Sequence, residues 1–271
     1  MRTLSEHYRA ALVTGASSGL GAAFTDMLLA EGLEVYGTSR SPEKMPERPG
    51  LHRLPLDLAD GDSMGAFLES MQEEWPKIDV LVNNAGNGIF NRFEEFEPEQ
   101  IGEQLRVLLH GPMALCHAAL PHFLLRGNGM IVNVASLARA FPLPYFSLYN
   151  AAKAGLSNFS RSLQTELSGT GVGVIDFQPG DYRTRFNAEA ARPDELDLDP
   201  RLKQAWESLD AHLRAAPEPE KAARGLRRAL ARGRSDTVAT GAFFQAVIAP
   251  LLYRIAPWRA VEWGLRKYYG I

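Results

Sequence analysis

A tyrosine and a lysine stand four positions apart in the run Tyr149-Asn150-Ala151-Ala152-Lys153. Residues at i and i+4 of a helix lie on one face, so the phenol and the ammonium group should point into the same space. A free phenol has a pKa of about 10 and is a poor base at neutral pH, but a nearby cation favours the phenolate. We therefore expect Lys153 to lower the pKa of Tyr149 so that it can pass a proton, with Ser136 hydrogen-bonded to the same reacting oxygen.

A glycine-rich turn, Thr14-Gly15-Ala16-Ser17-Ser18-Gly19-Leu20-Gly21, follows an apolar run and precedes a helical pattern. Such a turn gathers free backbone N–H groups and the positive end of a helix, where a pyrophosphate can bind, and glycines let the backbone come close. No Lys-Ser/Thr pair follows, which argues against a triphosphate P-loop. The turn predicts a dinucleotide site, and a purely structural turn is the alternative.

The end of the next predicted strand, Thr38-Ser39-Arg40, bears on the choice of dinucleotide. An acidic residue about 20 positions after the glycine turn would bind the ribose hydroxyls. Glu34 has nearly that spacing, but it opens the strand, whereas the ligand lies beyond the strand's carboxyl end. A hydroxyl and a guanidinium suit a 2′-phosphate, so Ser39 and Arg40 favour NADP(H) over NAD(H). For Arg40 the alternative is a solvated loop charge.

The elements that must position these residues alternate along the chain. Short apolar runs predict strands, and longer amphipathic patterns between them predict helices. The predicted strands are 10–13, 34–39, 51–56, 80–82, 130–134, 173–177 and 237–240. The main predicted helices are 19–31, 64–75, 149–167 and 101–125, and the last, with Pro112 and Pro121 inside, is either one long helix or two. This alternation, with near-continuously apolar strands, predicts an α/β fold in which helices cover both faces of a parallel sheet.

Composition narrows the class of protein. The chain has 271 residues, 45% of them hydrophobic and 23% charged, which is the ordinary globular range. A single cysteine, Cys116, excludes an intrachain disulfide and a cysteine-cluster metal site, so no metal is expected. Twenty-nine basic and 32 acidic residues give a formal charge of −3, which is no footprint for nucleic acid. A signal-peptide pattern is absent and the apolar stretch 242–258 is interrupted, so we expect a cytoplasmic protein.

Taken together, residues 9–241 resemble the short-chain dehydrogenase/reductase family. The family's Asn-Asn-Ala-Gly motif stands at 83–86 and its Pro-Gly motif at 179–180, and its catalytic Ser, Tyr and Lys correspond to Ser136, Tyr149 and Lys153. The resemblance implies a single doubly wound Rossmann-type domain with a parallel sheet of about seven strands. It also implies hydride transfer between a nicotinamide cofactor and a carbonyl or alcohol, in which Tyr149 donates the proton.

The resemblance further implies a cofactor site spread along the chain, with Asp57 on the adenine side and Thr184 near the nicotinamide amide. The predicted cofactor-binding residues are Gly15, Ser17, Ser18, Gly19, Leu20, Gly21, Ser39, Arg40, Asp57, Leu58, Asn84, Ala85, Gly86, Tyr149, Lys153, Pro179, Gly180, Tyr182 and Thr184.

Two positions depart from the family pattern. Leu108 stands where many members place an asparagine, three residues before Gly111, that anchors a water in the proton relay to the lysine. This departure puts the relay in doubt and leaves the hydride step in place. Asp181 stands where the family often has an apolar residue. We expect it to pair with Arg183 or Arg185 rather than to bind a polar group of the substrate.

The substrate side is rich in aromatic residues, which suits a bulky apolar ketone or aldehyde. The candidate lining residues are Phe90, Phe93, Phe141, Leu143, Tyr145 and Phe146. Residues 1–241 are predicted to form the catalytic domain, and 242–271 an apolar, aromatic extension of it. This extension could complete the core or the pocket, form a subunit interface, or contact a membrane surface, and we favour the first two.

The leading hypothesis is thus an NADP(H)-dependent oxidoreductase of the carbonyl reductase kind, acting as a homo-oligomer on a small-molecule carbonyl or alcohol. The alternatives are a cofactor-binding regulator or scaffold that has lost catalysis, and isomerisation or dehydration of a sugar nucleotide on a related fold. The short C-terminal part disfavours the last of these.

Overall fold

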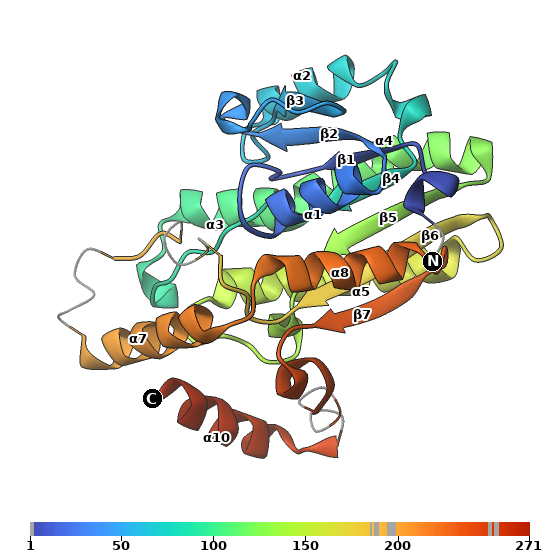
Figure 1. Cartoon of the computed structure of the whole chain (residues 1–271). Helices are drawn as coiled ribbons and strands as arrows, with labels where there is room; N and C mark the ends of the chain where they lie inside the picture. The colour runs from blue at the N-terminus through green and yellow to red at the C-terminus, as the bar shows by residue number, and fades with distance from the viewer. Residues whose placement is uncertain (1–2, 185, 187–189, 194–198, 249–250, 252–254) are drawn as a thin grey trace.

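The centre of the molecule is a seven-stranded sheet in the order β3-β2-β1-β4-β5-β6-β7 (Figure 1). The computed structural model describes residues 3–184, 186, 190–193, 199–248, 251 and 255–271. Every neighbouring pair of strands is parallel. The strands are β1 (Ala10–Val13), β2 (Glu34–Ser39), β3 (Leu51–Pro55), β4 (Val80–Asn83), β5 (Gly129–Val134), β6 (Val172–Pro179) and β7 (Asp236–Thr240).

Helices cover both faces of the sheet, because successive residues of a buried strand point to opposite sides. On one face Ala11 and Val13 of β1 pack with α1 and α8, which lie side by side. On the other, Leu12 packs with α2, α4 and α5. The described helices are α1 (Gly19–Ala30), α2 (Gly61–Ser70), α3 (Pro98–Leu105), α4 (Gly111–Arg126), α5 (Ser147–Glu166), α7 (Pro200–Ala215), α8 (Pro219–Leu230) and α10 (Trp258–Tyr269). The predicted doubly wound Rossmann-type fold is confirmed.

The helical stretch predicted over 101–125, as one helix or two, is divided in the structure. A π-helical turn, Arg106–His110, separates α3 from α4. Pro112 is the second residue of α4 and has no N–H to donate to a carbonyl of the preceding turn, which fits the change of helix type at this point. The whole stretch Pro98–Arg126 is long and apolar enough to cross a membrane by length and composition alone. Several α4 side chains, including Leu115, lie in the core against the sheet, so this apolar character has a packing explanation.

The predicted functional segments meet at one edge of the sheet. The glycine turn follows β1, the Asn-Asn-Ala-Gly motif begins at the end of β4, Ser136 follows β5, and Pro179 and Gly180 stand at the end of β6. The strand order reverses between β1 and β4, and ligands of open α/β sheets bind outside the carboxyl ends of the strands at such a switch point.

A third cluster of buried side chains lies outside the sheet layers. Phe90 and Phe146 from two loops pack with Trp206 of α7 and Tyr269 of α10. The two aromatic rings of Phe90 and Trp206 are 5.0 Å apart between centroids. The cluster fixes α7 and α10 next to each other, beside the carboxyl edge of the sheet (Figure 1).

Candidate active site

Ser136, Tyr149 and Lys153 come together between the end of β5 and the first two turns of α5. Ser136 caps a short 3-10 turn, where its Oγ accepts a hydrogen bond from the N–H of Ala138 at 3.0 Å. The Lys153 side chain is buried; its Nζ donates to the carbonyl oxygen of Val134 at 2.7 Å and lies 5.8 Å from the centre of the Tyr149 ring. The helical spacing of Tyr149 and Lys153 therefore brings the two side chains to one side of α5, as expected.

Burial shifts the pKa values of Tyr149 and Lys153. Desolvation raises the pKa of Tyr149 to about 12; a hydrogen bond with Ser136 lowers it, and the charge of Asp181 raises it further. Desolvation also lowers the pKa of Lys153 to about 8. The expectation that Lys153 lowers the pKa of Tyr149 is wrong for this structure, because the loss of hydration outweighs the attraction of a distant cation. Tyr149 is a protonated hydrogen-bond donor at neutral pH.

A cavity of about 250 Å³ runs along the carboxyl edge of β1, β2 and β4. Most of the predicted cofactor-binding residues line it, from both the glycine turn and the motif after β4. These are Gly15, Ser17, Ser18, Gly19, Leu20, Ser39, Arg40, Asp57, Leu58, Asn84, Ala85, Gly86, Tyr149, Lys153, Pro179 and Thr184. Gly21, Gly180 and Tyr182 do not line this cleft. Gly180 and Tyr182 line a neighbouring cavity, and Gly21 lies behind the turn, where a Cβ would stand 2.0 Å from the carbonyl oxygen of Gly15.

The glycine turn is fastened to the motif after β4 by hydrogen bonds. Thr14 Oγ1 accepts from the N–H groups of Asn84 and Ala85, both at 2.9 Å, and Asn84 Nδ2 donates to the carbonyl oxygen of Thr14 at 2.9 Å. Gly15 and Gly19 have φ of +67° and +54°, in the left-handed region that glycine adopts without strain. Asn84 thus holds the shape of the turn from a position about 70 residues away.

Ser39, at the end of β2, and Arg40, which follows it, line the far end of the cleft. Ser39 Oγ donates to Ser17 Oγ at 3.1 Å, which ties the strand to the glycine turn. Arg40 is exposed at the rim of the cavity and forms no ion pair with any residue that the structure describes. Its guanidinium is therefore available to an anion in the cleft.

Leu108 occupies the asparagine position with a fully buried apolar side chain. It lies in the π-helical turn and packs against Gly86, where an added Cβ would come within 2.4 Å of Leu108 Cδ2. Gly86 has a φ of +156° and leaves the space that Leu108 fills. The apolar side chain of Leu108 thus fills the space next to Gly86, the last residue of the Asn-Asn-Ala-Gly motif.

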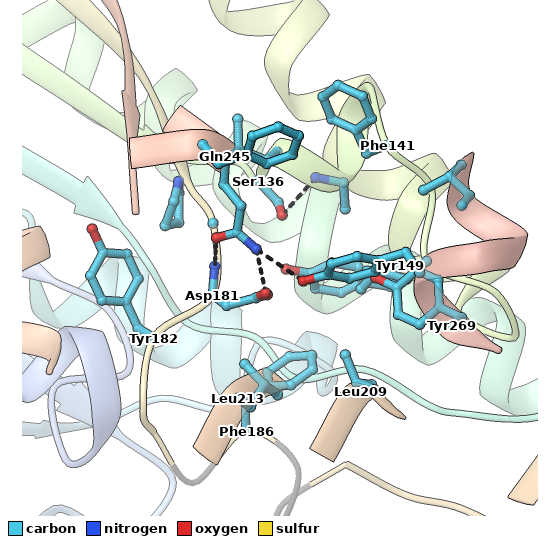
Figure 2. A pocket seen from close by; sticks show the side chains of 18 of the residues that line it. Ser136, Phe141, Tyr149, Asp181, Tyr182, Phe186, Leu209, Leu213, Gln245 and Tyr269 are labelled. Carbon is cyan, nitrogen blue, oxygen red and sulfur yellow. Dashed lines mark hydrogen bonds between the residues drawn. The ribbon is translucent and has the colours of Figure 1, made fainter. Parts of the chain in front are cut away.

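A second cavity, of about 520 Å³, adjoins the cleft and contains Ser136 and Tyr149 in its wall (Figure 2). We call it the apolar chamber, since most of its lining is apolar. Phe141 and Leu143 line it as expected, whereas Phe90 and Phe146 belong to the buried cluster and Phe93 is exposed. Sequence reasoning missed the lining from α7, which is Leu209 and Leu213. The C-terminal segment completes the pocket, one of the two roles favoured for it, through Phe244, Gln245, Ala256, Ala260, Val261, Gly264, Leu265, Tyr268 and Tyr269.

Asp181 is the one charged residue among the described residues that line the chamber. Gln245 holds it from above: its Nε2 donates to Asp181 Oδ2 at 2.5 Å, and its Oε1 accepts from the Asp181 N–H at 3.3 Å (Figure 2). The same Nε2 lies 3.4 Å from the hydroxyl of Tyr268. The expected pairing with Arg183 is wrong, because Arg183 pairs with Glu218. Arg185 lies outside the described residues.

Comparison with known proteins gives a consistent result. The short chain dehydrogenase family matches residues 9–195. A 3-ketodihydrosphingosine reductase of Bacteroides thetaiotaomicron is 34% identical over 175 residues, which are 65% of this chain and 64% of that protein. This chain therefore spans less than two thirds of that relative. A 2-(R)-hydroxypropyl-CoM dehydrogenase of Xanthobacter autotrophicus is 34% identical over 188 residues, 65% of this chain and 75% of that protein.

Solved structures agree with the family match. A short-chain dehydrogenase from Streptomyces avermitilis is 29% identical with a TM-score of 0.78, covering 96% of this chain and 99% of that one. A serine dehydrogenase in its closed form, complexed with NADP+, is 26% identical with a TM-score of 0.72, covering 86% of this chain and 94% of the other.

Proposed function

Because the chain belongs to the short-chain dehydrogenase/reductase family, we propose that it is an NADP(H)-dependent oxidoreductase that moves a hydride between the cofactor and a carbonyl compound or secondary alcohol. One observation carries the proposal: Tyr149 lies where the cofactor cleft and the apolar chamber meet, and lines both. A proton donor at that junction can reach the oxygen of a chamber-bound substrate whose carbon faces the cleft.

The cleft fits NADP(H) at both ends. Gly15 and Gly19 let the turn after β1 approach a pyrophosphate. The hydrogen bond from Asn84 to the carbonyl oxygen of Thr14 holds the turn in shape. Ser39 and the Arg40 guanidinium, which has no ion-pair partner among the described residues, suit a 2′-phosphate, whereas an acidic residue here would repel it. The bound NADP+ of the serine dehydrogenase, a protein of similar fold, supports this choice.

The cofactor supplies the hydride when it is bound. Ser136 Oγ accepts from Ala138 and is hydrogen-bonded with Tyr149, so its O–H lies beside the phenol and can be shared with a substrate oxygen bound there. Tyr149 is protonated at neutral pH, since its pKa is about 12, and donates its proton as charge develops on that oxygen. The ammonium group of Lys153 lies 5.8 Å from the centre of the Tyr149 ring and is placed to hold the ribose of the cofactor. In the oxidising direction the same groups act in reverse.

The chamber favours a bulky, mainly apolar substrate with one polar group near the reacting carbon. Its volume of about 520 Å³ suits a molecule of drug size or larger, and Asp181 presents a carboxylate near Tyr149. A carboxylate so placed favours an ammonium or hydroxyl group beside the carbonyl. The Bacteroides relative is named for the reduction of a keto-dihydrosphingosine and the Xanthobacter relative for the dehydrogenation of a hydroxypropyl compound, so the proposal covers both directions.

Consumption of NADPH with a panel of bulky ketones tests the proposal. We expect turnover with the wild type and nearly none with Tyr149→Phe, which should still bind NADPH because only the proton donor is removed. Tyr36→Phe is the matched control, since the Tyr36 hydroxyl bonds Glu74 at 2.5 Å and Tyr36 lines neither cavity. Full turnover by Tyr149→Phe would refute the mechanism.

A cofactor-binding regulator or scaffold is the alternative, and Leu108 at the asparagine position is the observation in its favour. Tight NADPH binding without consumption across the whole panel would support it. The predicted homo-oligomer, cytoplasmic location and 1–241 catalytic domain stay predictions, which analytical ultracentrifugation, cell fractionation and truncation would test.

A further inference from the structure

Large apolar side chains stand exposed on the C-terminal segment. Ile255 is 81% exposed and Trp263 65%, values that leave these side chains almost fully in water. We call the exposed members of this segment the tail surface, leaving out Tyr268, which is 41% exposed but also lines the chamber. The members are Phe243, Phe244, Val247, Ile248, Leu251, Ile255, Trp258 and Trp263. Apolar patches of this kind mark contact with a partner or a membrane, because water contact with so many apolar groups is unfavourable.

Helix α10 has two different faces, as the helical period requires. Ala260, Val261, Gly264, Leu265 and Tyr268 face inward and line the apolar chamber. The opposite face presents Arg259, Trp263, Arg266 and Lys267, with Glu262 as its one acid, along a shallow surface hollow. Lys267 Nζ lies 5.5 Å from the centre of the Trp263 ring, so cation and aromatic ring form one unit.

The charge of the outer face is opposite to that of the whole protein. Three cations and one acid stand on α10, whereas the whole chain has a formal charge of −3. An exposed helix that combines tryptophan with arginine and lysine is typical of segments that lie in the headgroup region of a membrane. We propose that the tail surface and the outer face of α10 dock on an anionic lipid surface.

Pairing of this surface with a second copy is less favourable. A two-fold contact through α10 would bring Arg259, Arg266 and Lys267 of both copies together, and like charges in an interface oppose association. Anionic headgroups offer these cations opposite charges while the acyl region takes Trp258 and Ile255. Charge complementarity therefore selects lipid over self-association.

Docking would place the chamber against the membrane. Phe244 is 57% exposed and also lines the chamber, so the tail surface and the chamber wall are continuous there. A lipophilic carbonyl compound could then pass from the bilayer to Tyr149 without crossing bulk water. This last step rests on the proposed function, whereas docking itself does not, so vesicle binding and turnover are measured separately.

Vesicle flotation of the full chain tests the proposal, with phosphatidylcholine alone and with equal parts of phosphatidylcholine and phosphatidylglycerol. We expect binding to the anionic vesicles that weakens in high salt. Arg259→Gln/Arg266→Gln/Lys267→Gln should weaken it about 100-fold, since each cation near an anionic surface contributes roughly fivefold. Trp263→Ser should also weaken it. Leu125→Ser is the matched control, because Leu125 is 88% exposed but lies on α4, and its binding should equal that of the wild type.

Tryptophan fluorescence gives a second readout. Trp75 and Trp206 are buried, so a blue shift on adding anionic vesicles reports Trp258 and Trp263. Thermal denaturation checks that each variant is folded. The proposal is overturned if the wild type binds neither kind of vesicle, or if the glutamine variant binds as tightly as the wild type. A dimer that Trp263→Ser dissociates, without vesicle binding, would instead assign the surface to contact between copies.

Discussion

Lys153 carries a positive charge into the interior of the protein, and this charge should oppose folding. Its side chain is 5% exposed and makes one hydrogen bond, to the carbonyl oxygen of Val134. No carboxylate pairs with it among the residues that the structure describes. Burial lowers its pKa from 10.5 to about 8, which corresponds to roughly 3 kcal/mol of lost stability when the group is charged.

The sign of the pH dependence follows from linkage. Below pH 8 the ammonium group is charged in both the folded and the unfolded chain, so the folded state bears the whole desolvation penalty. Between pH 8 and 10.5 the folded chain loses the proton first and the unfolded chain binds more protons, so stability rises with pH. Above 10.5 the group is neutral in both states and its penalty has gone.

Lys153→Met should therefore stabilise the protein while abolishing turnover. Allowing about 1 kcal/mol for the lost hydrogen bond, we expect a gain of about 2 kcal/mol at pH 7 that disappears near pH 10. Urea denaturation without cofactor at the two pH values measures it. Lys221→Met, an exposed lysine of α8, is the control and should change little. A loss of stability at pH 7, or a gain that does not depend on pH, would refute the reasoning.

Three further predictions concern specificity and the relay. Wild-type kcat/KM should favour NADPH over NADH by about one to two decades, because charge-assisted bonds to a 2′-phosphate contribute roughly 1.5–3 kcal/mol each. The double variant Ser39→Asp/Arg40→Leu should reverse this ratio. Equal kcat/KM for the two cofactors in the wild type would contradict the prediction. Leu108→Asn should change turnover by less than about tenfold. It should lower the urea midpoint of unfolding, because an amide replaces a fully buried apolar group. A hundredfold gain in turnover would show that Leu108 limits the reaction. Asp181→Asn should lower kcat/KM about tenfold or more for ketones with a neighbouring ammonium group and leave plain ketones unchanged; an equal loss for both would assign Asp181 to structure alone.

Local patterns explain how much the sequence could predict. Tyr149 and Lys153 share a helix face because their spacing matches the helical period. The strands β1, β4, β5 and β6 are recognisable as apolar runs because both faces of each are buried. The glycine turn was recognisable because its position between strand and helix requires positive φ at Gly15 and Gly19. Each of these features is determined within a few residues.

Features that depend on distant contacts could not be predicted. The partner of Asp181 is Gln245, which lies 64 residues later, whereas the local sequence predicts a nearby arginine. The pKa of Tyr149 depends on how many side chains exclude water from it, and spacing carries no such information. The sequence favours a pocket or an interface role for the C-terminal segment, and the packing of α10 on α7, which no local pattern specifies, places it in the chamber wall.

The π-helical turn Arg106–His110 sets the rotational phase of α4. A π turn holds one residue more than an α turn, and each residue advances a helix by about 100°. Leu115, Ala119 and Phe123 face the sheet with that residue in place. Deleting one residue from the turn would rotate this apolar stripe toward solvent, whereas exchanging one apolar side chain for another at Leu108 would not. Among homologous sequences, insertions and deletions should therefore be rarer in this turn than substitutions.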